Sequence, residues 1–307
     1  TLEFEDHRPL YDWVVRECEF DPAPRQIEFA KLYLTNVVTG KRYIKKLVQD
    51  GVVDGWDDPR LVSISGLRRR GYTPESIQKF VELCGVSKAD SSVDYAMLEY
   101  CIREDLKLKK PRMMAILDPI KLVIDNYPEG EMEYLEVPNN MENPELGSRQ
   151  VPFGRELYIE REDFMEEPVK KFFRLAPGKE VRLKGAYFVT CTDFVKDENG
   201  NVVEVHCTYD PETRSGSGFE GRKVKGTLHW VSASDNVKAT ARLYDYMMLD
   251  NPDDPNGEMI MNPNSLEVKE NVVIEKSIAG AQKGQRYQFM RNGYYIVDTK
   301  DTKEDHL

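Results

Sequence analysis

The first third of the chain carries hydrophobic residues at helical spacing. Between Ile77 and Cys84, apolar positions recur at intervals that place them on one face of a helix. Thr73 suits the N-cap of this segment, Pro74 suits its first turn, and Gly85 suits its C-terminal stop. The pattern predicts a helix from Pro74 to about Cys84.

Two further helices are predicted on the same grounds. One follows Pro9 and covers Leu10 to Val15. The other begins at Ser91 or Ser92 and places apolar residues from Tyr95 to Leu106 on a single face. We therefore expect a helical domain in this part of the chain.

After Pro111 the pattern changes to short β-rich stretches separated by turn signals. Asn199-Gly200 and Asn292-Gly293 are typical hairpin turns, and the proline- and acid-rich stretches 128–146 and 250–258 are expected to be exposed loops. Several short strands with turns between them favour one or two antiparallel β-barrels. The predicted strands cover residues 113–118, 120–124, 157–160, 187–195, 202–209, 223–231 and 294–297.

Composition fits a soluble globular protein of more than one domain. The 307 residues exceed one typical domain, 40% of them are hydrophobic and 32% are charged. The net charge of −11 argues against indiscriminate nucleic-acid binding. Residues 1–112 hold 19 basic and 19 acidic residues, so the remainder carries the whole negative charge. Any RNA binding would depend on local basic patches.

Cysteine and histidine usage excludes some site classes. The five cysteines include no C-x-x-C pair, and the four histidines form no H-x-x-x-H pair, so we expect no disulfide framework and no metal site. No apolar run is long enough to span a membrane, and residues 1–6 do not resemble a signal peptide. We expect a cytoplasmic monomer, and the abrupt start without a methionine suggests a fragment.

Generic catalytic motifs are absent. The chain has no P-loop, no dinucleotide-binding glycine motif and no G-x-S-x-G motif. The turn from Val38 to Arg42 presents two cations and could hold a phosphate, although a solvated helix start has the same pattern. Basic clusters with interleaved aromatics, such as the one around Phe172 and Phe173, suit either single-stranded RNA or a solvated strand face.

Longer strings resemble the glutaminyl-tRNA synthetase family, in the family's order and spacing over nearly the whole chain. The strings C-I-R-E-D, G-S-R-Q-V-P-F and H-W-V-S favour the glutaminyl branch, whereas W-D-D-P-R and L-R-R-R-G also occur in some glutamyl enzymes. The strings are L-Y-D-W at 10–13, G-W-D-D-P-R-L at 55–61, S-G-L-R-R-R-G at 65–71, C-I-R-E-D-L at 101–106, P-R-M-M-A at 111–115, G-S-R-Q-V-P-F at 147–153, R-K-V-K-G at 222–226 and H-W-V-S at 229–232.

This resemblance implies an α+β multidomain fold. Residues 1–50 would be the end of a Rossmann-type catalytic domain, 51–110 a helical tRNA-contacting subdomain, and 111–307 two antiparallel β-barrels of the ribosomal L25-like, anticodon-binding type. The implied function is ATP- and Mg²⁺-dependent ligation of glutamine to tRNA-Gln, contacted along its acceptor-stem side, inner L and anticodon loop. The H-I-G-H signature is absent from these residues. The chain alone is therefore expected to be inactive and to bind no cofactor tightly.

The resemblance also implies site residues. Lys41 matches the catalytic lysine of the K-M-S-K-S loop, which stabilises charge on the triphosphate, and Thr39-Gly40 stand where many members have Met-Ser. The segment from Ser87 to Asp94 matches a stretch that contacts the inside of the tRNA L. The implied ATP-binding residues are Thr1, Lys31, Leu32, Thr39, Gly40 and Lys41, and the implied inner-L contacts are Ser87, Lys88, Asp90 and Ser91.

The implied anticodon-reading residues are spread over about 180 positions of the sequence. Lys171 and Lys184 stand where the family often has glutamine and arginine, and Met290 replaces an acidic residue. The set comprises Arg112, Lys171, Arg174, Arg182, Lys184, Gln288 and Arg291.

Two alternatives stay open on the sequence alone. The chain could be a fragment of a glutamyl-tRNA synthetase, because the residues that select the amino acid would lie elsewhere. It could also be a non-catalytic RNA-binding protein with L25-like barrels, although such a protein would have no use for the Lys41 loop.

Overall fold

The structure is a computed structural model that describes residues 2–251, 258–304 and 306–307. The chain divides into two compact units. The helical unit contains residues 1–68, 72–106 and 246–265, and the strand unit contains residues 69–71, 107–245 and 266–307. Residues 246–265 therefore belong to the helical unit although strands of the strand unit flank them in sequence.

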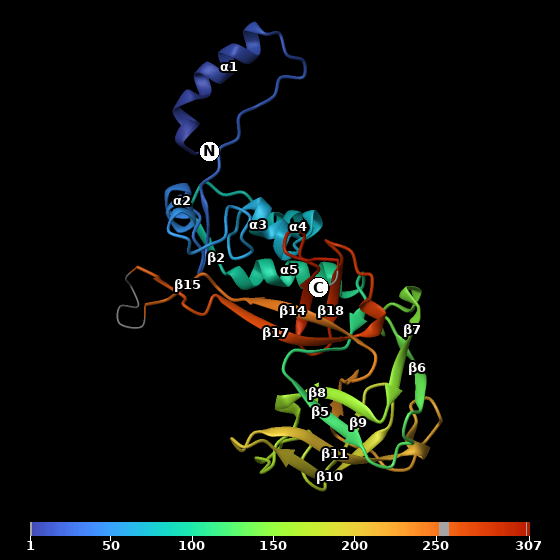
Figure 1. Cartoon of the computed structure of the whole chain (residues 1–307). Helices are drawn as coiled ribbons and strands as arrows, with labels where there is room; N and C mark the ends of the chain where they lie inside the picture. Colours follow the sequence, from blue (N-terminus) through green and yellow to red (C-terminus); the bar gives the residue numbers. More distant parts are fainter. Residues whose placement is uncertain (1, 252–257, 305) are drawn as a thin grey trace. The chain divides into compact units, whose positions relative to one another are not determined.

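The helical unit combines helices with two short two-stranded sheets (Figure 1). The helix predicted after Pro9 is confirmed as α1. Its elements are the 3-10 helix Leu2–His7, α1 Arg8–Glu17, β1 Leu32–Leu34, α2 Lys41–Gln49, α3 Ile64–Arg70 (whose last two residues belong to the strand unit), α4 Pro74–Cys84, β2 Ser91–Val93, α5 Tyr95–Lys107, β15 Met248–Leu249 and β16 Ile260–Met261.

The predicted limits of α4 are confirmed. The Thr73 hydroxyl accepts a hydrogen bond from the Ser76 amide at 3.2 Å, and the Ser76 hydroxyl accepts one from the Thr73 amide at 3.2 Å. This reciprocal capping box satisfies amides that the first turn leaves without helical partners. Gly85 follows the helix with φ of 69°, a left-handed conformation that glycine adopts without strain.

The predicted start of the next helix at Ser91 or Ser92 is wrong. Ser91–Val93 forms β2, which pairs in parallel with β1. The Asp94 carboxylate accepts a hydrogen bond from the Ala96 amide at 2.9 Å, so α5 begins only at Tyr95. Pairing with a strand about 60 residues earlier in the chain overrides the local helical signal.

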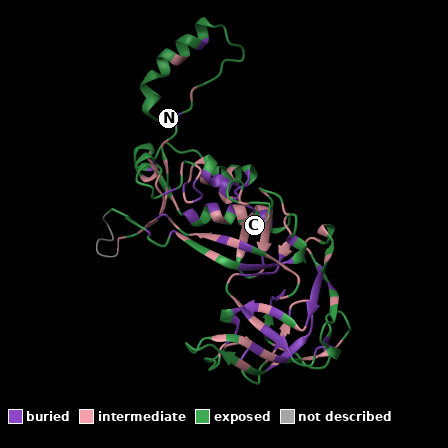
Figure 2. Cartoon of the chain, viewed as in Figure 1, coloured by how far each residue is buried: buried purple, intermediate pink, exposed green. Residues whose placement is uncertain are grey.

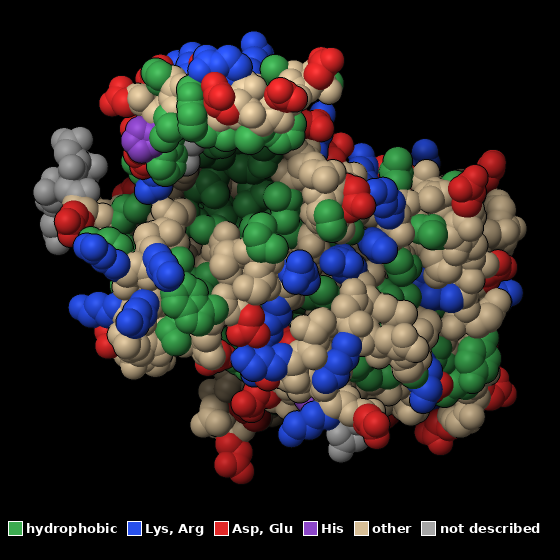
Figure 3. Space-filling model, turned by 90° about the horizontal axis from the view of Figure 1, so that it is seen from above, with side chains coloured by type: hydrophobic (Ala, Val, Ile, Leu, Met, Phe, Trp, Pro, Cys, Tyr) green, Lys and Arg blue, Asp and Glu red, His purple; other side chains and the backbone are tan. Residues whose placement is uncertain are grey.

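The buried faces of α4 and α5 form the main core of the helical unit, with Phe80, Tyr95 and Leu98 among its buried side chains. A smaller cluster joins Ile44 of α2 to Met247, beside β15. In contrast, α1 is almost entirely exposed (Figure 2). Figure 3, which views the molecule from above, shows hydrophobic side chains gathered in a hollow.

The strand unit consists mainly of sheets, and the largest has seven strands in the order β12-β9-β10-β11-β5-β8-β13. The other sheets are β14-β17-β4, β19-β18-β3 and β6-β7. The strands are β3 Arg112–Met113, β4 Ala115–Ile116, β5 Pro119–Ile124, β6 Met132–Pro138, β7 Ser148–Gly154, β8 Glu156–Glu160, β9 Glu180–Leu183, β10 Phe188–Lys196, β11 Val202–Asp210, β12 Thr227–Leu228, β13 Val231–Ser232, β14 Asn236–Tyr244, β17 Leu266–Glu275, β18 Arg286–Phe289 and β19 Gly293–Ile296.

The expectation of purely antiparallel sheets is wrong. The pairs β11–β5, β12–β9 and β18–β3 are parallel. A parallel pair requires a connection that returns to the same end of the sheet, and long intervening segments provide it, as between β5 and β11. Two sheets of the strand unit are therefore mixed, whereas β14-β17-β4 and β6-β7 are antiparallel.

The two hairpin predictions are confirmed, whereas the loop predicted at 128–146 is wrong. Asn199-Gly200 joins β10 to β11, and Asn292-Gly293 lies where β18 turns into β19. Residues 132–138 form β6, with Leu135 and Val137 buried. The sequence hides the alternation because Glu133 lies on the same face as these two residues, whereas Met132 and Tyr134 lie on the exposed face. Of the loop predicted at 250–258, residues 252–257 lie outside the described part of the chain.

The core of the strand unit is aromatic and aliphatic, and Figure 2 shows its buried positions in purple. Phe153 and Trp230 are completely buried and meet edge to face at 5.1 Å between ring centroids. Glu160 is also buried, and it accepts hydrogen bonds from the Leu117 and Asp118 amides at 2.9 Å each. Although burial opposes it, hydrogen bonding to His229 and these amides lowers the pKa of Glu160.

Among the described residues, no helix is long and apolar enough to cross a membrane. The same residues contain no group of His, Cys, Asp and Glu side chains arranged to hold a metal ion. All five cysteines are free.

We predict that Thr73→Ala lowers the free energy of unfolding by about 1–2 kcal/mol. The change removes the cap of α4 and a hydrogen bond of 2.7 Å from the Thr73 hydroxyl to Asp105. Urea unfolding measures the effect, and Thr73→Ser, which keeps the hydroxyl, is the matched control. Equal stability of the alanine and serine variants would show that the cap contributes nothing.

Candidate nucleic-acid interface

An open hollow of about 440 Å³ in the strand unit brings together residues from three separate parts of the sequence. Three of its residues belong to the implied anticodon-reading set: Lys171, Arg174 and Arg291. The complete lining consists of Lys171, Phe172, Phe173, Arg174, Lys225, Gly226, Thr227 and Arg291.

Backbone geometry fixes the walls of this hollow. A Cβ on Gly226 would lie 2.1 Å from the Phe173 carbonyl oxygen, so only glycine allows the two segments to approach this closely. The Leu175 amide donates to the Asp163 carbonyl at 2.9 Å and anchors the end of the other wall. Arg291 has φ of 68° in the turn between β18 and β19.

A buried carboxylate holds two of the arginines. The side chain of Asp163 is 0% exposed, and both of its oxygens accept hydrogen bonds from Arg291, at 2.6 Å and 2.7 Å. Arg174 Nε lies 3.3 Å from the same carboxylate, and its Nη1 donates to the Glu162 side chain at 3.0 Å. The hydrogen bonds to Asp163 raise the pKa of Arg291.

The hollow carries more positive than negative charge. Its lining includes four cations, whereas the carboxylates paired with them belong to Asp163 and Glu162. Phe173 is half exposed, and Lys225 Nζ lies 4.9 Å from the centroid of its ring. Cations beside an accessible aromatic face can bind a phosphate or a base edge and stack on an unpaired base.

Two other implied anticodon residues lie side by side. Gln288 of β18 is the register partner of Arg112 of β3. Arg112 forms an ion pair with Glu142 at 2.6 Å. Within the described part of the chain, Arg112 Nε and Gln288 Oε1 are buried without a hydrogen-bond partner. Each of these buried atoms is a polar group whose hydrogen-bonding capacity the fold leaves unsatisfied.

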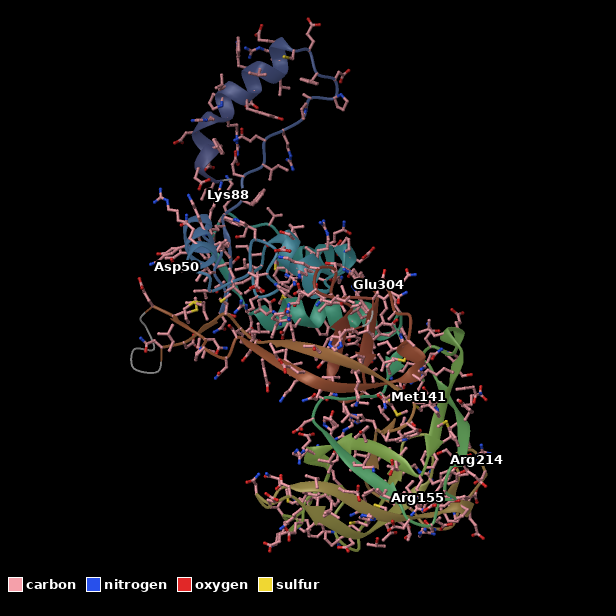
Figure 4. All side chains as sticks on the ribbon, viewed as in Figure 1. Asp50, Lys88, Met141, Arg155, Arg214 and Glu304 are labelled. Atoms are coloured by element: carbon pink, nitrogen blue, oxygen red, sulfur yellow. The ribbon has the colours of Figure 1, made fainter. Side chains whose placement is uncertain are left out.

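Lys184 and Arg182, the remaining two residues of the implied set, also lie outside the lining of the hollow. Lys184 Nζ lies 3.3 Å from the sulfur of Met141, which is labelled in Figure 4. The Arg182 guanidinium lies 4.2 Å from the Phe188 ring centroid and donates to Ser215 Oγ at 2.9 Å. Burial lowers the pKa of Arg182.

Several residues in and beneath this hollow have no distinct signal in the sequence. Lys225 lies in a basic cluster that the sequence shows, but nothing there distinguishes it from its neighbours. In the sequence, Phe173 is only an aromatic residue among cations. Asp163 gives no sequence signal, because its importance arises from its burial between two arginines.

The Lys41 loop lies in the helical unit. Gly40 is the N-cap of α2, and Lys41 is its first residue, exposed and without an ion pair among the described residues. The first turn of α2 contains Lys41 and Arg42 and no acidic residue. Cations at a helix N-terminus are electrostatically unfavourable unless an anion compensates them. Thr1, also implied in ATP binding, lies outside the described residues.

The structure brings together the implied ATP-binding strand and the implied inner-L segment. Leu32 of β1 is the register partner of Ser91 of β2, and the Ala30 amide donates to the Ser87 carbonyl at 2.8 Å. The neighbouring residues Lys31, Thr39 and Asp90 are exposed. Lys88, labelled in Figure 4, pairs with Glu5 at 2.6 Å.

Three sequence models of one family match most of the chain. The description "tRNA synthetases class I (E and Q)" applies to a catalytic domain matched at residues 1–108 and to anti-codon binding domains matched at 110–210 and 227–298. The chain belongs to this family of class I tRNA synthetases.

Curated relatives agree with this assignment. The chain is 58% identical to a glutamine–tRNA ligase of Clostridium perfringens, 55% to one of Clostridioides difficile and 50% to one of Haemophilus influenzae. These matches cover 100%, 99% and 100% of this chain, respectively. The chain spans only 56%, 56% and 55% of the lengths of these relatives.

We predict that Gly226→Ala destabilises the strand unit by about 1–3 kcal/mol, because the added methyl group forces the Phe173 segment to move. Urea unfolding measures this effect. The matched control is Gly154→Ala, where the nearest atom to the added Cβ is a carbonyl oxygen at 3.4 Å. If both variants unfold at the wild-type urea concentration, the two walls are not in tight contact.

Proposed function

We propose that this chain is the tRNA-orienting and anticodon-reading part of a glutamine–tRNA ligase. The observation that carries this proposal is the meeting of Lys171, Arg174 and Arg291 in one hollow. These residues span some 120 positions of sequence, and the family resemblance implies an anticodon contact for each. Residues of a binding pocket are expected to line one hollow in this way. Unrelated surface cations are not.

The charges support recognition of particular bases over general phosphate attraction. The net charge of the chain is −11, so long-range attraction to RNA is weak. Affinity must then come from placed contacts, which are arginine forks on base edges and aromatic faces that stack on bases. Arg112 and Gln288, register partners in β3 and β18, are two further residues of the implied anticodon-reading set.

The helical unit would serve the adenylation step. Lys41 stands at the N-terminus of α2, where a bound triphosphate would compensate the clustered cations. Its ammonium would neutralise the charge that develops on the leaving pyrophosphate. ATP would bring Mg²⁺ with it, since Mg²⁺ is usually held largely by substrate phosphates.

Finer features follow from the same proposal. The sheets of the strand unit would correspond to two L25-like anticodon-binding barrels within residues 111–307, after a catalytic segment at 1–50 and a helical subdomain at 51–110. The partners would be tRNA-Gln, glutamine and ATP. The ligase would act as a cytoplasmic monomer, in agreement with five free cysteines.

The printed names of the relatives favour this proposal over its alternatives. A glutamyl enzyme would share the family models, which cover both specificities, but the three relatives cited above are named glutamine–tRNA ligases. A non-catalytic RNA-binding protein would not need the match to the catalytic domain at residues 1–108.

We predict that Arg174→Ala weakens binding of tRNA-Gln by about 1–3 kcal/mol and reduces discrimination against a tRNA with a changed anticodon. Lys225→Ala, the matched change in the same hollow, should weaken both tRNAs alike and flatten the salt dependence, because a lysine contacts phosphate as a point charge. Titrations of both tRNAs at two salt concentrations measure this. Equal weakening of both tRNAs by Arg174→Ala would contradict base reading.

We predict that Lys41→Ala, made in a ligase that contains the whole catalytic domain, lowers the rate of glutamine-dependent ATP–pyrophosphate exchange by about 10²–10³-fold. Affinity for tRNA-Gln should change little. The control is Lys45→Ala on the same helix. An exchange rate within a few-fold of wild type would exclude a catalytic role for Lys41.

A further inference from the structure

Two neighbours, Asp163 and His229, hold the guanidinium of Arg291 by hydrogen bonds. Its Nη1 donates to Asp163 Oδ2 at 2.6 Å, and its Nη2 donates to Asp163 Oδ1 at 2.7 Å. His229 Nδ1 lies 3.3 Å from Nη1. Glu162 Oε1 lies 3.7 Å from Nη2, beyond hydrogen-bonding distance.

The buried surroundings of His229 fix the direction of its hydrogen bond to Arg291. His229 is 2% exposed, and its Nε2 lies 2.9 Å from the Ala115 carbonyl oxygen. A carbonyl oxygen can only accept, so Nε2 carries a proton; a guanidinium can only donate, so Nδ1 accepts from Arg291. Both Nη1 protons of Arg291 therefore have acceptors.

Counting the N–H donors of the Arg291 guanidinium shows which of them stay available to a ligand. A guanidinium has five N–H donors in one plane. Asp163 uses one on each terminal nitrogen, and His229 uses the second on Nη1. The Nε–H and the second Nη2–H remain, side by side on one edge. Arg291 lines the hollow, and a third of its side chain is exposed.

We propose that Asp163, assisted by His229, is a positioning residue that fixes Arg291 with its Nε–Nη2 edge free to bind ligand in the hollow. The hollow then selects groups that present two adjacent hydrogen-bond acceptors. In RNA these are the O6 and N7 atoms of guanine or two phosphate oxygens. This inference rests on the proposed function, since it takes RNA as the ligand.

The same contacts explain why Asp163 affects the ligand selectivity of the hollow and not only its charge. A carboxylate that is completely buried must be paired, and a two-point pair with Arg291 allows one orientation of the guanidinium plane. Asparagine at position 163 would keep one acceptor and replace the other with a donor. The guanidinium would then lose its fixed orientation while keeping its positive charge.

The test compares binding of three short stem–loop RNAs to the chain by fluorescence anisotropy. One carries the glutamine anticodon CUG, the second has 7-deazaguanine in place of the anticodon guanine, and the third has methylphosphonates at the anticodon phosphates. The wild type should bind one modified RNA roughly ten-fold more weakly. A loss with 7-deazaguanine identifies a guanine edge, and a loss with methylphosphonates identifies phosphate.

Asp163→Asn should abolish this difference, so that the unmodified and the sensitive modified RNA bind equally. Asp235→Asn, which removes the carboxylate of a surface pair with Lys276, is the matched control and should keep it. Retention of the full difference by Asp163→Asn overturns the inference, as does a wild type that binds all three RNAs alike. A wild type that binds none of them refutes the proposed function itself.

A measurement on the wild-type chain covers the case in which Asp163→Asn does not fold. Two-point pairing slows rotation of the guanidinium, so the Nη protons of Arg291 should give separate resonances in NMR spectra of ¹⁵N-arginine-labelled protein, assigned with Arg291→Lys. A single averaged resonance would show that Asp163 does not fix the guanidinium and would overturn the inference.

Discussion

The burial of one carboxylate determines how the hollow is built. Asp163 is completely removed from solvent, and an unpaired charge in that position would cost several kcal/mol. The chain satisfies it with Arg291 and Arg174, which come from segments more than 100 residues apart. Because Asp163 needs these cations, they stay in place without a ligand, and the hollow is preorganised.

This arrangement would reconcile an acidic chain with the proposed RNA ligand. The strand unit has no general positive field, so RNA binding would depend on a few groups whose positions are fixed by buried partners. The close approach of Gly226 to the Phe173 backbone serves the same purpose, since it fixes the wall that carries Arg174. A rigid pocket in a negative background favours discrimination between RNAs over general affinity for them.

The sequence predicted features that depend on neighbouring residues. The cap at Thr73, the stop at Gly85 and the hairpin turn at Asn199 follow from local backbone chemistry. The start of α5 was wrong because a distant strand recruits Ser91–Val93, and the parallel pairs depend on which remote strands become neighbours. For the site, family resemblance selected Arg174 and Arg291, but burial and close approach, which single out Asp163 and Gly226, exist only in the folded chain.

The most direct test of the account is photo-crosslinking of a stem–loop RNA with a photoreactive anticodon base, followed by mass spectrometry of the linked peptides. If the hollow binds an anticodon base, cross-links should map to its walls, at Phe172–Arg174, Lys225–Thr227 or Arg291. Cross-links confined to residues outside these walls, with efficient RNA binding, would show that the hollow does not read the anticodon.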